Sequence, residues 1–331
     1  MPEVRTDPLS GLHTIVAGDR AGRPGGGLST TPPDPIDPEK DPFLEGHEDR
    51  TPPEVHAVPK PGVTDRAPDT PGWAVRVVPN LYPALTPDAH ETPPQEVPDL
   101  FTAAPARGEH EVIVNAPEPV HSLGECSADQ VALALGAWQE RMAHHRDAGA
   151  ACVHLIVNER REAGSSLPHT HAQLYALDFV PAAIARERER FGAYATRTMG
   201  GNLLGDLVQE EVRRRERIVA IDDEAVLMAP YGSRLPYQLM LAPRMPRRCF
   251  GDDGPTGASL LHDGLNRLAR RLGAHPPLNL WVRTAPSGAD QFAWRIDITP
   301  RLTHLAGLEL GSGVHICIVP PETAAAQLRD V

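Results

Sequence analysis

The sequence predicts an α+β fold built from two consecutive β–β–α–β–β units behind a proline-rich N-terminal wrap. Hydrophobic residues make up 40% of the 331 residues, which is enough for a substantial core. Of the 36 prolines, 23 precede residue 120, so the first third of the chain is expected to be rich in loops. From residue 72 onward, apolar strands and one apolar helix follow each other in the same order twice. We therefore expect an internal duplication.

The first unit is predicted to span residues 67–222 and follows an N-terminal region over residues 1–66. A capping box of Ser127 and Gln130 predicts the start of its helix, and Gly149 predicts the end. Period-two alternation predicts strands at 11–17, 73–78, 111–114, 152–157 and 169–176. The Pro-Pro pairs between residues 31 and 61 predict an extended wrap there.

The second unit is predicted to span residues 223–331. Leucines at helical spacing predict its helix over 260–272. Strands are expected at 225–231, 237–242, 278–283 and 292–298, and two helices at 181–198 and 202–217 precede the unit. Ala293, Trp294 and Arg295 occupy the region where the first unit has a row of histidines. Only the first unit is therefore expected to be catalytic.

Charge and composition exclude several classes of function. The chain has 32 Lys and Arg against 44 Asp and Glu, a net charge of −12, which argues against a nucleic-acid-binding or anionic-membrane-binding protein. No apolar run approaches the length of a membrane span, and the N-terminus does not resemble a signal peptide. The four cysteines are widely spaced and are expected to be reduced. We expect a soluble, cytoplasmic protein.

A polar row follows the Gly-Ser turn that begins at Gly164. On a strand, His169, His171, Gln173 and Tyr175 share one face, and the residues between them share the other. The two histidines are open to three interpretations: buried structural residues, zinc ligands, or a nucleophile that carries a phosphoryl group on an imidazole nitrogen. Clustered groups that titrate near neutrality favour a functional site.

The sequence resembles galactose-1-phosphate uridylyltransferase and its nucleotidyltransferase relatives in the histidine-triad superfamily. The resemblance runs over nearly the whole chain, and its motifs are Asp7-Pro8-Leu9 with Asp19-Arg20 and Arg23-Pro24, Gly46-His47-Glu48 with Thr51-Pro52-Pro53-Glu54, Arg76 to Pro83, His110 to Val114, and Pro168 to Gln173. It implies duplicated histidine-triad-like repeats with an antiparallel sheet. It also implies a possible homodimer.

The resemblance implies a two-step transfer between a nucleotide sugar of the UDP-glucose type and a sugar phosphate such as galactose-1-phosphate. His171 matches the nucleophile that forms a nucleotidyl-histidine, and Gln173 matches the residue that hydrogen-bonds the phosphoryl oxygens. His169 is expected to orient the site and to pack within it. The further substrate-binding positions implied by the resemblance are Arg20, Arg23, Asn80, Tyr82, Asn158 and Ser166.

The chain departs from the family pattern at two places. Where the family draws zinc ligands from a Cys-x-x-Cys pair and a downstream His, this sequence has Asp41, Leu44 and Pro119. We therefore expect no zinc and no other cofactor, with Asp41, His121 and His169 as the only weak metal candidates.

The second departure is the glycine-rich segment 306–315, which resembles that of adenylyltransferase-like relatives. It contains Glu309, a candidate substrate-binding residue, and predicts weak discrimination between hexose phosphates with some use of inorganic phosphate. Two alternatives to the uridylyltransferase follow. One is an ADP-glucose-type phosphorylase that uses inorganic phosphate, and the other is a non-catalytic nucleotide-binding protein.

Overall fold

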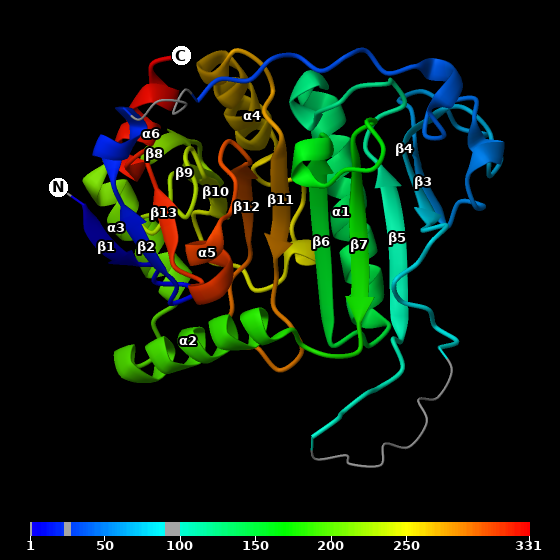
Figure 1. The fold of residues 1–331 in the computed structure, drawn as a ribbon. Helices are drawn as coiled ribbons and strands as arrows, with labels where there is room; N and C mark the ends of the chain where they lie inside the picture. The colour runs from blue at the N-terminus through cyan, green and yellow to red at the C-terminus, as the bar shows by residue number, and fades with distance from the viewer. Residues whose placement is uncertain (1, 23–27, 90–99) are drawn as a thin grey trace.

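One antiparallel sheet forms the centre of the molecule (Figure 1). The computed structural model describes residues 2–22, 28–89 and 100–331. All neighbouring strands of this sheet run antiparallel. In spatial order, its ten strands are β3 (His56–Pro59), β4 (Trp73–Pro79), β5 (Gly108–Val114), β7 (His171–Leu177), β6 (Cys152–Glu159), β11 (Leu278–Arg283), β12 (Arg295–Pro300), β10 (Leu239–Pro243), β9 (Ala225–Met228) and β8 (Ile218–Ile221). The predicted α+β class with an antiparallel sheet is confirmed.

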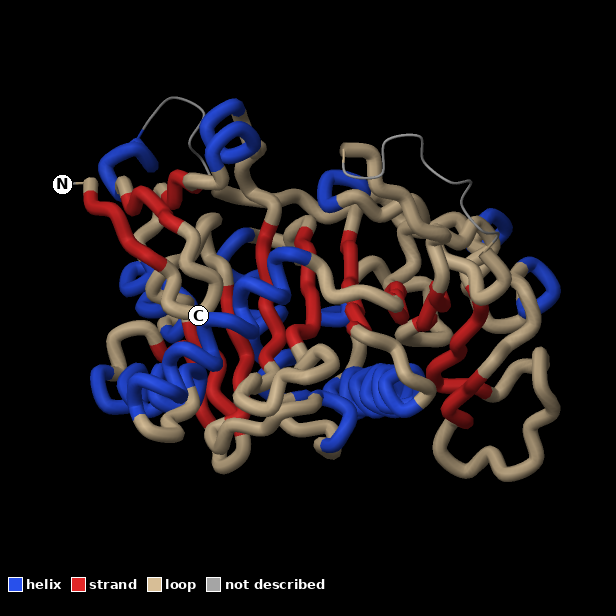
Figure 2. The backbone as a smooth tube through the Cα atoms, turned by 90° about the horizontal axis from the view of Figure 1, so that it is seen from below, coloured by secondary structure: helices blue, strands red, loops and turns tan. Residues whose placement is uncertain are grey.

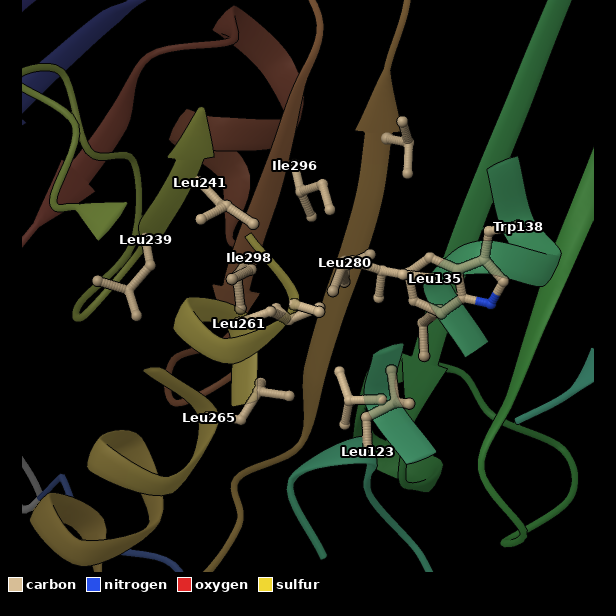
Figure 3. Packing of buried hydrophobic residues seen from close by; sticks show 14 of the residues in the cluster. Leu123, Leu135, Trp138, Leu239, Leu241, Leu261, Leu265, Leu280, Ile296 and Ile298 are labelled. Atoms are coloured by element: carbon tan, nitrogen blue, oxygen red, sulfur yellow. The ribbon is translucent and has the colours of Figure 1, made fainter. Parts of the chain in front are cut away.

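The main core fills one face of this sheet. Two long helices, α1 (Ala128–Asp147) and α4 (Ala258–Leu272), cover the face together with α6 (Pro321–Arg329). In the view from below, α1 lies on one side of the row of strands (Figure 2). Leu135 and Trp138 of α1 and Leu261 of α4 pack onto the strands around Leu280 (Figure 3).

Two smaller apolar clusters cover only the ends of the opposite face. At one end, α2 (Ala182–Thr198) and α3 (Leu203–Arg214) pack onto Met228 and Met240. At the other end, Phe43 packs near Val112 and Val114. Between these clusters, β7, β6, β11 and β12 direct polar side chains away from the main core. Polar groups of this chain can therefore gather in the middle of the opposite face.

A second, three-stranded sheet stands beside the first. It has the order β1 (Glu3–Thr6), β2 (His13–Val16) and β13 (His315–Cys317), and β13 follows the short helix α5 (Gly307–Ser312). This sheet lies at the β8 end of the molecule (Figure 1). All four cysteines are free, as predicted. None of the described helices is long and apolar enough to cross a membrane.

Several local predictions need correction. Ser127 does cap α1, because its side chain accepts a bond from the backbone N–H of Gln130 at 3.1 Å. The Gln130 amide nitrogen donates to two backbone carbonyls outside the helix, at 2.7 Å each, and the Gln130 side chain forms no reciprocal bond with the backbone N–H of Ser127 among the described residues, so the predicted capping box is wrong. Residues 292–294 precede β12 instead of belonging to it, because Phe292 and Ala293 pack into an apolar cluster and the Trp294 indole N–H donates to Asp253. The glycine-rich segment 306–315 contains the short helix α5.

The two predicted units share a single sheet. They are joined where β6 pairs with β11, from Leu278 opposite Glu159 to Trp281 opposite Ile156. β8 and the helices α2 and α3 lie before residue 223, yet they pack with strands β9 and β10 of the second unit. The internal duplication and its boundaries at 66 and 222 remain predictions.

Candidate active site

A cavity of about 400 Å³ opens beside the N-terminal end of β7. We call it the His171 cavity. Strands β4, β5 and β7 form its floor, and the segments around Phe43 and Ser166 form its walls. Five of the predicted site residues line it, namely His171, Gln173, Asn80, Tyr82 and Ser166. The volume lies within the range of pockets that hold small ligands.

The local structure fixes the tautomer of His171. Its Nδ1 lies 2.7 Å from the backbone carbonyl oxygen of His169. A carbonyl only accepts, so Nδ1 carries the hydrogen, and Nε2 keeps its lone pair. His171 is 5% exposed, and burial lowers its pKa, although the bond to the His169 carbonyl acts in the opposite direction. His171 is therefore a neutral imidazole with one free basic nitrogen.

Gln173 is held by two side chains that the sequence analysis did not assign to the site. Its Oε1 accepts from the Tyr175 hydroxyl at 3.0 Å and lies 3.1 Å from Nε2 of His110. His110 Nδ1 accepts from the backbone N–H of Ala84 at 3.1 Å, so the hydrogen of this neutral ring is on Nε2. The Asn80 amide nitrogen and Gln173 Oε1 both lie 3.1 Å from Nε2, and only the Gln173 oxygen can accept this hydrogen. Both bonds occupy the amide oxygen, and the amide N–H groups of Gln173 remain free to donate.

The rings of His110 and Tyr175 support each other. They stack with centroids 4.2 Å apart and an interplanar angle of 24°. They are opposite one another in the pairing of β5 with β7. Burial lowers the pKa of His110, although its bond to Gln173 acts in the opposite direction. No pattern within β5 alone could have shown this contact, because it depends on the register between two strands.

His169 lies before β7, so the prediction that it belongs to the strand is wrong. It is completely buried and is held between two acceptors. Its Nδ1 is 2.7 Å from Oδ2 of Asp41, and its Nε2 is 2.8 Å from the carbonyl oxygen of Ala116. Asp41 Oδ1 also accepts from the backbone N–H of Phe43 at 3.0 Å. Both ring nitrogens of His169 therefore face oxygen atoms, and the pair of His169 and Asp41 joins the segment before β7 to the segment around Phe43.

The side chains around this pair do not fit a four-coordinate zinc. Asp41 and His169 already bond to each other, and His121 Nε2 lies 2.9 Å from the Asp34 carbonyl oxygen instead of joining them. Among residues 2–22, 28–89 and 100–331, no group of three or more His, Cys, Asp or Glu side chains is arranged to hold a metal ion. Structural zinc needs a closed set of four ligands, and this region supplies two.

Asn80, Tyr82 and Ser166 lie at the edge of the His171 cavity. Asn80 Oδ1 accepts from the backbone N–H of Tyr82 at 2.8 Å, while the Tyr82 side chain is 86% exposed. Asn158 does not line the cavity. It follows Val157, which is paired with Ala172, and its Oδ1 accepts from the Asn279 side chain on β11 at 2.8 Å.

Two other predicted substrate-binding residues, Arg20 and Glu309, are not at this site. Arg20 is exposed in a short helix after β2, and Glu309 lies on α5, where it accepts from the backbone N–H of Ala306 at 2.9 Å. Both belong to the end of the molecule that carries the three-stranded sheet, far from β7 (Figure 1). Arg23 lies outside the described residues.

Comparison with known proteins places the chain in a family. A family model described as galactose-1-phosphate uridyl transferase, N-terminal domain, matches residues 1–181. The chain belongs to this family. A second model, a domain of unknown function (DUF4921), matches residues 122–330. The family resemblance predicted from the sequence motifs is confirmed.

Members of this family with different activities resemble the chain to a similar degree. An ADP-glucose phosphorylase of Arabidopsis thaliana is 28% identical over 100% of this chain and 93% of its own length. A galactose-1-phosphate uridylyltransferase of Cryptococcus neoformans is 29% identical over 85% of this chain and 74% of its own length. The chain is thus a member of an enzyme family that contains both activities.

Solved structures share the fold over the whole chain. The crystal structure of the A. thaliana ADP-glucose phosphorylase with bound ADP-glucose has a TM-score of 0.81 at 24% identity and covers 100% of this chain and 99% of that one. A uridylyltransferase structure has a TM-score of 0.75 at 23% identity, covering 100% and 98%. At these identities the likeness establishes the fold alone.

Proposed function

We propose that this member of the galactose-1-phosphate uridyl transferase family transfers a nucleoside monophosphate from a nucleotide sugar through a covalent intermediate on His171. One observation carries the proposal. The Nδ1–H of His171 donates to the His169 carbonyl oxygen, with 2.7 Å between nitrogen and oxygen. This bond leaves Nε2 as a free nucleophile at the wall of a ligand-sized cavity. The free N–H groups of Gln173 line the same cavity.

In the first step, the lone pair of His171 Nε2 attacks the α-phosphorus of the nucleotide sugar. The bond from that phosphorus to the bridging oxygen breaks, and hexose-1-phosphate leaves with the electron pair. A sugar phosphate has a second pKa near 6, so it leaves without a proton donor, and an amide at position 173 is sufficient. The N–H groups of Gln173 stabilise the charge on the transferring oxygens.

In the second step, an oxygen of the acceptor phosphate attacks the same phosphorus. The nitrogen–phosphorus bond breaks, and its electron pair returns to Nε2. While the nucleotidyl group is attached, the imidazole ring is positively charged, and the His169 carbonyl still accepts from Nδ1–H. No proton has to move between the enzyme and the substrate in either step.

We propose galactose-1-phosphate as the acceptor and a UDP-glucose-type donor, with ADP-glucose and inorganic phosphate as the second candidate pair. The observation that favours the second pair is the match to an ADP-glucose phosphorylase over the full length of this chain. Initial rates with both donors and both acceptors distinguish the pairs. A strong preference for galactose-1-phosphate, with no turnover on phosphate, would exclude the phosphorylase.

We further propose that Arg20 and Glu309 contact substrate in a second copy of the chain. Neither residue lines the His171 cavity of its own chain, so a homodimer is the arrangement in which both assigned roles hold. Mixing inactive His171→Ala chains with inactive Arg20→Ala chains tests this proposal. Partial recovery of activity in the mixture is expected, and its absence in a chain shown to be monomeric would contradict it.

The covalent intermediate separates an enzyme from a non-catalytic nucleotide-binding protein. The chain is incubated with UDP-glucose or ADP-glucose labelled at the α-phosphorus, without any acceptor. We expect acid-labile label on the protein, released by galactose-1-phosphate or phosphate, and no label on His171→Ala. Tight binding of nucleotide without any label would favour the non-catalytic alternative.

A further inference from the structure

The second half of the molecule contains a separate cavity that the proposed reaction does not use. It has a volume of about 130 Å³ and lies among β10, β11, β12, the start of α2 and the segment that begins at Asp7. We call it the Arg295 cavity. Strands β6 and β11 separate β12 from β7, so the two sites are about 14 Å apart at the usual spacing of strands.

Four arginines and three carboxylates line this cavity, which leaves one net positive charge in a chain whose net charge is −12. The arginines are Arg186, Arg234, Arg283 and Arg295, and the carboxylates are Asp7, Glu187 and Asp297. Clustered arginines of this kind recognise oxyanions, because the planar guanidinium presents N–H groups in a fixed fork.

The carboxylates already have partners within the protein. Glu187 accepts from Arg295 at 3.0 Å and from Arg283 at 3.4 Å. Asp297 accepts from the Trp281 indole N–H at 2.9 Å and from Arg295 Nε at 3.3 Å. Asp7 accepts from the backbone N–H groups of the two turn residues that follow Pro8, at 3.2 and 3.1 Å. The carboxylate oxygens are therefore largely occupied and do not satisfy the remaining arginine N–H groups.

Two of the arginines retain free donors. Arg295 is 4% exposed, and its Nη1 has no hydrogen-bond partner although it is buried. For Arg234, the described residues provide no hydrogen-bond or ion-pair partner for the guanidinium, which stacks over the Trp281 ring at 5.5 Å. Burial lowers the pKa of Arg234, and the carboxylates of Asp297 and Asp7 oppose that effect. Buried donors without an acceptor are uncommon in proteins and call for a partner.

We propose that the Arg295 cavity is a binding site for a small oxyanion such as inorganic phosphate, held by Arg295 Nη1 and the guanidinium of Arg234. The volume suits an anion of this size, because it is well below the 300 Å³ or so at which pockets for nucleotides and other small organic molecules begin. The bound anion contacts the segment after β1, α2 and the central sheet together.

Calorimetric titration of inorganic phosphate into the full-length protein tests this proposal. The informative variant is Arg234→Gln, which removes the guanidinium without touching the Glu187 ion pairs. Arg271→Gln is the matched control, because Arg271 also stacks over an aromatic ring, Tyr237 at 5.4 Å, but lines a different part of the surface. We expect Arg234→Gln to weaken phosphate binding by about tenfold or more and Arg271→Gln to leave it unchanged.

A second variant keeps the experiment decisive if phosphate also binds beside His171. His171→Gly should retain the site that depends on Arg234, and sulfate should compete for it. Equal phosphate affinity in Arg234→Gln and the unmodified protein would overturn the proposal. So would a melting temperature that is the same in phosphate as in chloride of equal ionic strength.

Discussion

Two rows of polar side chains lie on the same face of one sheet and differ in what the fold leaves free. On β7, His171 and Gln173 are uncharged, and the bonds from their neighbours leave free one imidazole nitrogen and the N–H groups of one amide. On β12, Arg295 and Asp297 are charged and bonded to each other, and one guanidinium nitrogen remains free. A basic lone pair supports bond formation, whereas a fixed cation supports binding. The chemistry of each row follows from its unoccupied atoms.

The largest expected difference between the rows is in catalysis. His171→Ala should lower nucleotidyl exchange by at least about 10⁴-fold, because no other group at that position supplies the nucleophile. Imidazole in solution should restore part of the activity of His171→Gly. Thr299→Val, on β12, is the control and should exchange at nearly the normal rate. Substantial turnover by the alanine variant would remove His171 from its proposed role.

The second prediction concerns the stability contributed by the buried pair of Asp41 and His169, which lies next to the polar side chains of β7. Asp41→Asn should lower the free energy of unfolding by about 3–5 kcal/mol, because it removes one partner of a completely buried pair and leaves the other side chain without that partner. Urea unfolding measures the change. Asp37→Asn, which breaks an exposed pair with Lys40, is the control and should change the free energy of unfolding far less. Similar losses in both variants would show that the buried pair contributes no more to the free energy of unfolding than the exposed pair.

The third prediction concerns the orientation of Gln173. Tyr175→Phe removes one of the two bonds to its amide oxygen and should lower kcat by about tenfold, with a smaller effect on KM. Tyr194→Phe, which removes an exposed bond to Asp206, is the control and should have no effect. A change confined to KM would indicate that the amide acts in ground-state binding instead.

The fourth prediction is a pH dependence. Burial lowers the pKa of His171, so the nucleophile stays unprotonated below the usual pKa of a histidine, near 6.5. The acid limb of the kcat/KM profile should therefore fall at a pH below 6.5, with full activity above it. An acid limb centred above 6.5 would show that a negative group, or a substrate phosphate, dominates the environment of the ring.

The smallest expected effect is that of metal removal. Dialysis against a chelator should leave both activity and melting temperature unchanged, because Asp41 and His169 bond to each other and lack two further ligands. Metal analysis before and after dialysis checks this prediction. One zinc per chain that survives dialysis would contradict it.

The sequence predicts the longer elements well, because their periodicity is local. The alternation over residues 278–283 coincides with β11, and the predicted helix from Ser127 coincides closely with α1. The four-residue strands β1, β3 and β8 are not predicted, because they are too short to show a clear period and derive their stability from pairing. Strands β2 and β9 have the same length but lie within longer apolar runs that are predicted as strands. Residues 292–294 are apolar because they are buried in the loop before β12, and composition alone does not distinguish a buried loop from a buried strand.

The periodicity of the sequence predicts the candidate site only where its residues are neighbours along the chain, whereas Asn80 and Tyr82 are expected there from the family resemblance alone. His171 and Gln173 alternate along one strand, so their shared face follows from the period of two. One bond to each of them is also local, because His171 is held by the carbonyl of His169 and Gln173 by the hydroxyl of Tyr175. The other supports come from further away, since His110 is 63 residues from Gln173 and Asp41 is 128 residues from His169. Strand register and loop packing decide these contacts. The separation of Arg20 and Glu309 from the cavity has the same origin.

The pairing of β6 with β11 has a consequence for the order in which the chain is synthesised. β6 ends at Glu159 and its partner begins only at Leu278, so roughly 120 residues must be translated before one edge of β6 is covered. At about 5–20 residues per second this takes roughly 6–24 s. During that interval the nascent chain presents an open, apolar strand edge of the kind that promotes association between chains. Emerging ribosome-bound chains are thus expected to depend on chaperones most strongly between β6 and β11.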